Sequence, residues 1–189
     1  MAAPKTVPVL WLESAAARPG DTVLAGVRLK MAPKWHTYWR NAGESGGPTE
    51  IEWQLPEGIT AGPIQWPVPE KYDFAGLVTY VYHDEAVLIV PFQLAKTLQP
   101  GVVEIKAAVS WLECEELCVP GSGSVRATLT IGSEKVPSSN ASALNAALQQ
   151  LPKDGSALNG RALWEQPAAG ETRNYIVERL VAVPLPKAD

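Results

Sequence analysis

Hydrophobic and polar residues alternate along much of the chain, and such alternation is typical of strands that bury one face of a sheet. The segment LAGVRLK (24–30) shows the pattern cleanly, and TEIEWQL (49–55) places Ile51, Trp53 and Leu55 on one face. Turns that contain proline or glycine separate these segments at short intervals. Roughly eight or nine short strands with no long helix predict an all-β fold of the sandwich type.

Two pairs of neighbouring segments predict antiparallel hairpins. The first pairs LVTYVYH (77–83) with AVLIVPFQL (86–94) across a turn centred on Asp84. The second pairs GVVEIKAAVSWLE (101–113) with SVRATLTIG (124–132). The connection within the second hairpin then contains the only two cysteines of the chain.

The segment IQWPVPEKYDFAG (64–76) breaks the pattern, because its prolines cannot donate hydrogen bonds to a neighbouring strand. It carries Trp66, Tyr72 and Phe74 in what we expect to be an irregular loop. Aromatic side chains exposed in a loop call for an explanation beyond packing.

The pattern changes again after Gly132, so we place a domain at residues 1–132 and a C-terminal extension at 133–189. Alanine and leucine recur at helical spacing early in the extension, which predicts one helix over about 140–151 that ends before Pro152. A further strand is expected over about 173–183. The extension is too short and sparse to form an independent domain, so we expect either an appendage or the beginning of a second domain that is cut short.

Composition narrows the class of protein. The chain has 189 residues, 46% of them hydrophobic, and a formal net charge of −4, so bulk electrostatics do not favour nucleic acid. No segment approaches the roughly 20 apolar residues that span a membrane. The start MAAPKTVPV lacks the basic residues and apolar run of a signal peptide. We therefore expect a trimmed segment of a longer protein, soluble and monomeric by itself.

Cys114 and Cys118 are the only cysteines, and their spacing restricts what they can do. Residues four apart in an extended strand are separated by roughly 13 Å, whereas a disulfide needs Cα atoms within about 7 Å. The chain must therefore turn between them for a bond to form. Because the ring is small, a bond restrains little chain entropy, and the pair is better suited to exchange chemistry than to stapling the fold.

Two other interpretations of the cysteines stay open. One is an inert structural disulfide in a docking sandwich. The other is a copper site, because copper(I) favours thiolates, with His36 or His83 as a further ligand. The neighbouring Glu113, Glu115 and Glu116 place negative charge beside the sulfurs and disfavour the thiolate form.

Three separated motifs occur in order and carry a resemblance to a known family. They are KWHTYWRNAGESGGPTEIEWQLPEGI, GPIQWPVPEKYDFAGLVTYVYHDEAVLIVPF and VSWLECEELCVPGSGSV. Over roughly residues 7–132, the chain resembles the N-terminal periplasmic domain of the DsbD family of thiol:disulfide interchange proteins. The resemblance is closest to the ScsB branch, the suppressor of copper sensitivity proteins, and it implies an immunoglobulin-like β-sandwich.

The resemblance also implies a protein-disulfide reductase that works as a redox relay in the periplasm. In the family, this domain precedes a membrane-embedded core and a thioredoxin-like C-terminal domain that supplies its electrons. It passes them to periplasmic thioredoxin-fold proteins, such as disulfide isomerases, ScsC-like proteins or cytochrome c maturation proteins. We therefore expect a domain of an inner-membrane protein that needs no cofactor or metal and binds no nucleic acid.

By position, the resemblance assigns the catalytic role to the two cysteines. Cys118 would form the mixed disulfide with a partner, and Cys114 would resolve it. Tyr38 and His36 fall where better-known members carry tyrosines near the active site. Those members separate their cysteines by more residues than this chain does, so strain and partner choice are expected to differ.

The family guards its cysteines with a cap loop that bears an aromatic residue. The matching stretch here is KYDFAG, with Phe74 as the shield and Tyr72, Asp73 and Gly76 beside it. This assignment accounts for the aromatic residues in the proline-broken segment. Ala75 stands where those members have a second aromatic residue, so the motion of the cap is expected to differ.

Overall fold

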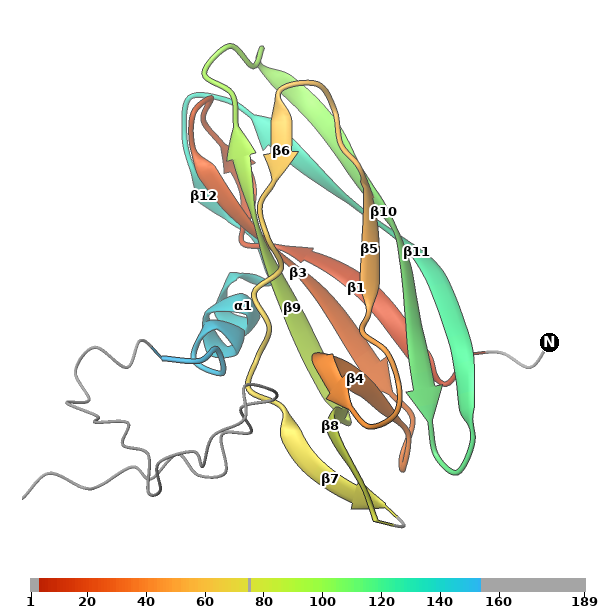
Figure 1. The fold of residues 1–189 in the computed structure, drawn as a ribbon. Helices are drawn as coiled ribbons and strands as arrows, with labels where there is room; N and C mark the ends of the chain where they lie inside the picture. The colour runs from red at the N-terminus through yellow and green to blue at the C-terminus, as the bar shows by residue number, and fades with distance from the viewer. Residues whose placement is uncertain (1–3, 75, 154–189) are drawn as a thin grey trace, which may run out of the picture. The chain divides into compact units, whose positions relative to one another are not determined.

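The computed structural model describes residues 4–74 and 76–153, which form two β-sheets and one helix (Figure 1). The smaller sheet has four antiparallel strands in the order β1 (Thr6–Leu12), β3 (Thr22–Met31), β9 (Glu85–Leu94) and β6 (Ile59–Ala61). The larger sheet has eight strands. Seven of them lie side by side in the order β12 (Val136–Pro137), β2 (Ser14–Ala17), β11 (Cys118–Ile131), β10 (Gly101–Cys114), β4 (His36–Gly43), β8 (Leu77–His83) and β7 (Glu70–Phe74). The eighth, β5 (Glu50–Gln54), lies off this path and pairs with β10.

The core lies between the sheets, where the alternation in the sequence places the apolar side chains. Along β10, Ile105, Ala107, Val109 and Trp111 are all buried, whereas the residues between them face outward. The smaller sheet contributes residues such as Phe92, whose ring meets Trp53 edge to face with centroids 4.8 Å apart. The predicted sandwich is therefore confirmed.

One predicted hairpin is wrong. The strands β8 and β9 follow each other in sequence but belong to different sheets, so the chain crosses the sandwich between them. Asp84 makes the crossing with a positive φ of 57°, a conformation that aspartate tolerates better than most residues. The sequence shows two strands and a turn, but a turn that changes sheets has the same local pattern as one that closes a hairpin.

The second hairpin is confirmed but is longer than predicted. Strands β10 and β11 pair without interruption from Gly101 opposite Ile131 to Cys114 opposite Cys118. The second strand was expected to begin near Ser124, because CVPGSG lacks alternating apolar residues. Gly121 explains this, since a Cβ there would overlap the Trp111 indole, so this part of the strand is packed by a side chain from its neighbour.

The predicted helix is present as α1 (Ala141–Leu148). Its apolar side chains Leu144 and Ala147 are buried in a cluster with Val87 and Ile89 of β9, on the side of that strand away from the main core. Gly26 leaves the space that Leu144 fills. The domain boundary at residue 132 stays a prediction, and the strand expected at 173–183 lies outside the described residues. Among the residues described, no helix is long and apolar enough to span a membrane.

Candidate functional site

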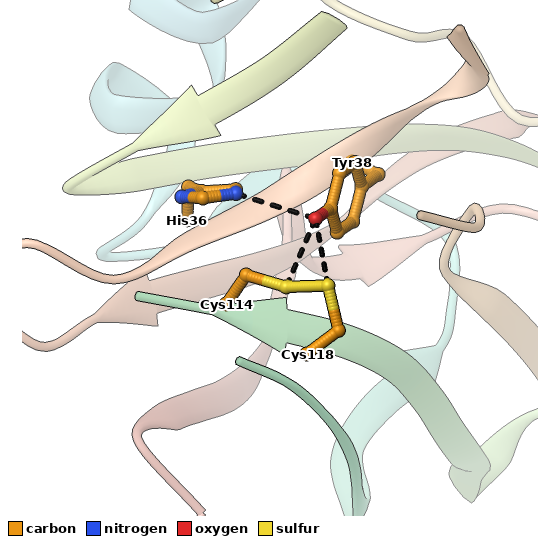
Figure 2. Close-up of a disulfide and its surroundings, with 4 residues drawn as sticks. All are labelled: His36, Tyr38, Cys114 and Cys118. Carbon is orange, nitrogen blue, oxygen red and sulfur yellow. Dashed lines mark hydrogen bonds between the residues drawn. A yellow bond between two sulfur atoms is a disulfide. The ribbon is translucent and has the colours of Figure 1, made fainter. Parts of the chain in front are cut away.

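The two cysteines lie at the tip of the β10–β11 hairpin and are joined by a disulfide (Figure 2). The chain bends over residues 115–117, which brings the two Cα atoms to 4.3 Å, so the turn required by the spacing is present. The two cysteines differ in access to solvent, because Cys114 is only 4% exposed and Cys118 is exposed. An incoming thiolate can therefore reach Cys118 more readily than Cys114.

Tyr38 on β4 directs its hydroxyl at both sulfur atoms (Figure 2). The oxygen lies 3.0 Å from Cys114 Sγ and 3.1 Å from Cys118 Sγ. The position follows from strand pairing, because His36 is the partner of Cys114 across β4 and β10, and Tyr38 is two residues further along the same face. Tyr38 is thus the hydrogen-bond donor beside whichever sulfur leaves when the disulfide breaks.

Burial keeps Tyr38 in its neutral, donating form. Its side chain is buried, and burial together with the nearby Tyr72 raises the pKa of the phenol above its usual value. Gly46 closes over the ring, because it has a φ of +92° and a Cβ there would overlap the aromatic carbons of Tyr38. In the sequence, the adjacent glycines Gly46 and Gly47 are the feature that indicates this close approach.

His36 contacts the other side of the Tyr38 hydroxyl, with Nε2 3.3 Å from the oxygen. Burial, followed by the influence of His83, lowers the pKa of His36 from 6.5 to about 4, so the ring is neutral near pH 7. The ring also packs against Tyr72 and His83, with centroid distances of 5.3 and 5.4 Å. His36 is therefore a second polar group in line with the disulfide.

The segment 64–76, expected to be an irregular loop, forms a strand directly after its last proline, Pro69. Strand β7 pairs with β8 from Glu70 to Phe74 and forms an edge hairpin. Gly76, at a φ of +82°, lies in the turn of this hairpin and donates its N–H to Asp73 Oδ1 at 3.2 Å. Both residues therefore shape the turn of the predicted cap.

The two aromatic residues of the predicted cap, Tyr72 and Phe74, differ in the side chains that they contact. Tyr72 packs against the cluster of Tyr38, Val81 and Cys114 and contacts the His36 ring. The Phe74 ring lies parallel to Tyr72 at 6.3 Å and is 54% exposed. Of the two aromatic residues in the predicted cap, Tyr72 therefore lies beside the neighbours of the disulfide, and Phe74 lies further out.

The three glutamates near the cysteines are not equivalent. Glu113 is buried on the opposite face of β10 from Cys114, where its carboxylate accepts hydrogen bonds from Trp111 Nε1 at 2.9 Å and the Lys5 backbone N–H at 2.8 Å. Glu115 and Glu116 are exposed at the hairpin tip. Glu113 therefore anchors the hairpin to the N-terminal segment, and the acidic tip consists of the other two.

The second histidine, His83, which was named above as a candidate copper ligand, lies beside the site. His83 faces His36 across β4 and β8, and its Nδ1 lies 3.1 Å from Glu70 Oε2. Within residues 4–74 and 76–153, no three His, Cys, Asp or Glu side chains are grouped so that they could hold a metal ion. In the sequence, the feature that indicates this contact is the position of His83 at the end of the predicted strand LVTYVYH.

We expect the folded protein to lose stability as the pH falls from about 6.5 to about 4 because of His36. In this window the unfolded chain binds a proton that the folded protein does not, so the free energy of unfolding decreases by on the order of 2–3 kcal/mol. Urea unfolding at a series of pH values measures this loss. His36→Gln should flatten the dependence, and an equally steep slope in that variant would contradict the assignment.

Comparisons with known proteins bear on the family and the fold. Residues 7–130 match the family model described as "Thiol:disulfide interchange protein DsbD, N-terminal". The N-terminal periplasmic domain of ScsB from Proteus mirabilis superposes with a TM-score of 0.52 at 20% identity, covering 76% of this chain and 53% of that one. The reduced N-terminal domain of DsbD from Neisseria meningitidis gives a TM-score of 0.38 at 19% identity, covering 71% and 91%. No curated protein sequence matches the chain.

The chain thus spans about half the length of the ScsB domain that it matches. The shared fold is an immunoglobulin-like β-sandwich, here with one short helix, as the resemblance implied.

Proposed function

We propose, because this chain belongs to the family of DsbD N-terminal domains, that it relays electrons by exchanging disulfides with partner proteins through Cys114 and Cys118. The observation that carries the proposal is the asymmetric disulfide at the hairpin tip, with Cys118 exposed, Cys114 buried, and the Tyr38 hydroxyl within 3.1 Å of both sulfurs. Thiol–disulfide exchange requires an accessible sulfur and a stabilised leaving thiolate. This tip provides both.

The difference in exposure between the two cysteines supports different roles for their sulfurs. A thiolate of an electron donor attacks Cys118 Sγ, the Cys114–Cys118 bond breaks, and Cys114 leaves as a thiolate beside the Tyr38 hydroxyl. The second thiol of the donor then displaces Cys118, and the domain is left with two thiols. In the reverse sense, the Cys118 thiolate attacks the disulfide of an acceptor, and Cys114 resolves the mixed disulfide. Two electrons and two protons pass in each cycle.

Four exposed apolar side chains, here called the apolar rim, support docking of a protein partner. They are Phe74 and Leu77 of the β7–β8 hairpin and Leu117 and Val119 of the β10–β11 hairpin. The tips of these two hairpins lie at the same end of the sandwich (Figure 1). Leu117 is 78% exposed although it lies between the cysteines. An apolar rim that borders a reactive sulfur favours short-lived contacts with a partner's own active-site surface.

From the family we propose the setting of this exchange. The electron donor is a thioredoxin-like domain of the same parent protein, which is held in the inner membrane by a separate core. The acceptors are periplasmic thioredoxin-fold proteins of the disulfide isomerase or ScsC-like kind, with cytochrome c maturation or copper tolerance as the downstream processes. The domain itself remains in the periplasm as a monomer without a cofactor.

The cap supplies a prediction that separates its two aromatic residues. We expect Tyr72→Ala to accelerate the reaction of the reduced domain with hydrogen peroxide several-fold, because Tyr72 packs against the cluster that contains Cys114. Phe74→Ala should accelerate it less, because that ring is half exposed. Stopped-flow oxidation followed by thiol counting measures both rates. Acceleration by Phe74→Ala alone would restore Phe74 as the shield, and no acceleration in either variant would remove the cap.

The experiment that tests the proposed function is the equilibrium reduction potential of the Cys114–Cys118 pair, measured by thiol trapping across a series of glutathione and dithiothreitol buffers. We expect a potential within the range of exchange proteins, roughly −270 to −120 mV. A potential below about −300 mV would indicate an inert structural bond and overturn the proposal. A pair that resists oxidation altogether would do the same and would direct attention to copper binding.

A further inference from the structure

A line of polar side chains leads from the buried sulfur to solvent. It begins at Cys114 Sγ, passes the Tyr38 hydroxyl at 3.0 Å and reaches His36 Nε2 at 3.3 Å from that hydroxyl. The His36 ring contacts the His83 ring, with centroids 5.4 Å apart, and His83 Nδ1 lies 3.1 Å from Glu70 Oε2. The Glu70 side chain is 69% exposed, so the line ends in water.

The protons of Tyr38 and His36 constrain each other. The phenol carries one proton, and neither sulfur of a disulfide can donate, so Tyr38 can direct its proton to a sulfur or to His36 but not to both. When it donates to a sulfur, its oxygen must accept a hydrogen bond from His36 Nε2–H. The neutral ring of His36 supplies that donor in only one of its two tautomers.

Among the side chains that contact the His36 ring, His83 is the one that a carboxylate holds in turn. Three residues lie next to His36: Tyr38 from the same strand, Tyr72 from β7, and Cys114 from β10. On β8, His83 is the direct cross-strand partner, and its ring stands edge-on to both His36 and Tyr72. The carboxylate of Glu70 in turn fixes the His83 ring from β7.

We infer that His83, held by Glu70, is a positioning residue for the exchange step: it packs against the His36 ring and holds it so that the Tyr38 hydroxyl proton stays directed at the disulfide. This inference rests on the proposed exchange function. The attacking thiol releases its proton to water as it becomes a thiolate. The electron pair of the broken S–S bond stays on Cys114, which accepts a hydrogen bond from the Tyr38 hydroxyl and takes up one proton from solvent.

The test compares the full chain with His83→Gln and Glu70→Gln. The control is Glu85→Gln, which removes an exposed carboxylate paired with Arg28 on the other sheet. The rate of reduction of the disulfide is measured with dithiothreitol and with purified thioredoxin between pH 5 and 8.5. We expect His83→Gln to slow both reductants by roughly tenfold and to alter the pH profile, a smaller loss than that of a direct acid–base group. The reduction rate of Glu70→Gln should lie between the rates of His83→Gln and the control.

A spectroscopic measurement distinguishes a positioning role of His83 from a role in partner docking or in folding. The chain has two histidines, so the ring ¹⁵N signals report the tautomer of His36 directly. We expect the Nε2–H tautomer in the wild type and a mixture of tautomers in His83→Gln. Slowing with thioredoxin alone would make His83 a docking residue and overturn the inference, as would an unchanged tautomer with unchanged rates. A wild-type disulfide that neither reductant opens would instead overturn the proposed function.

Discussion

Cys114→Ser is expected to turn the domain into a trap that holds its partner. The exposed Cys118 thiolate can still attack a partner disulfide, but no neighbouring thiol remains to resolve the product. Catalytic turnover should be lost, and a mixed disulfide through Cys118 should accumulate. Incubation with an oxidised thioredoxin-fold protein, followed by non-reducing electrophoresis and mass spectrometry of the linked peptides, measures this product.

The converse variant is the matched control. Cys118→Ser leaves only the buried Cys114, which is 4% exposed and packed beneath Tyr38, so we expect little or no mixed disulfide. Both variants remove the same bond, so any difference between them reports access to the sulfur and not loss of the ring. Trapping through Cys114 in preference to Cys118 would reverse the two roles.

The fold was largely predictable from the sequence, because a sheet that buries one face carries apolar residues at every second position of its strands. Strands such as β3 and β10 carry this signal over ten or more residues each. The failures have local causes. The crossing at Asp84 looks like a hairpin turn, and the start of β11 is packed by the Trp111 ring against glycines, so it lacks the apolar residues that mark a strand.

The site was predictable only where its residues are chemically distinctive. The cysteine spacing indicated a turn, and the family resemblance pointed to Tyr38 and His36, which the structure places in line with the disulfide. Residues that contribute by position gave no such signal. Gly46 closes over the Tyr38 ring, and His83 faces His36 only because β4 and β8 pair in this register. Contacts of this kind depend on strand pairing, which alternation does not specify.

Tyr38→Phe is expected to slow opening of the disulfide on the order of 100-fold. The Cys114 thiolate forms in a buried position, and the Tyr38 hydroxyl 3.0 Å away donates a hydrogen bond to it that becomes charge-assisted as the S–S bond breaks. Removing one donor aimed at a developing anion costs roughly 2.7–4 kcal/mol in other enzymes. The reduction potential should change less than the rate, because the disulfide and the protonated thiols are both neutral.

The measurement is the second-order rate constant for reduction by dithiothreitol at pH 7, with the potential determined on the same samples. Tyr80→Phe is the matched control, since it removes a phenol oxygen from β8 while its ring remains against Trp39. We expect this control to react at the wild-type rate. If Tyr38→Phe also reacts at that rate, the leaving thiolate is stabilised by something other than the tyrosine, and the central element of the proposed mechanism fails. If the rate and the potential fall by equal free energies, the hydroxyl stabilises the reduced product as much as the transition state, and its effect is not specific to bond breaking.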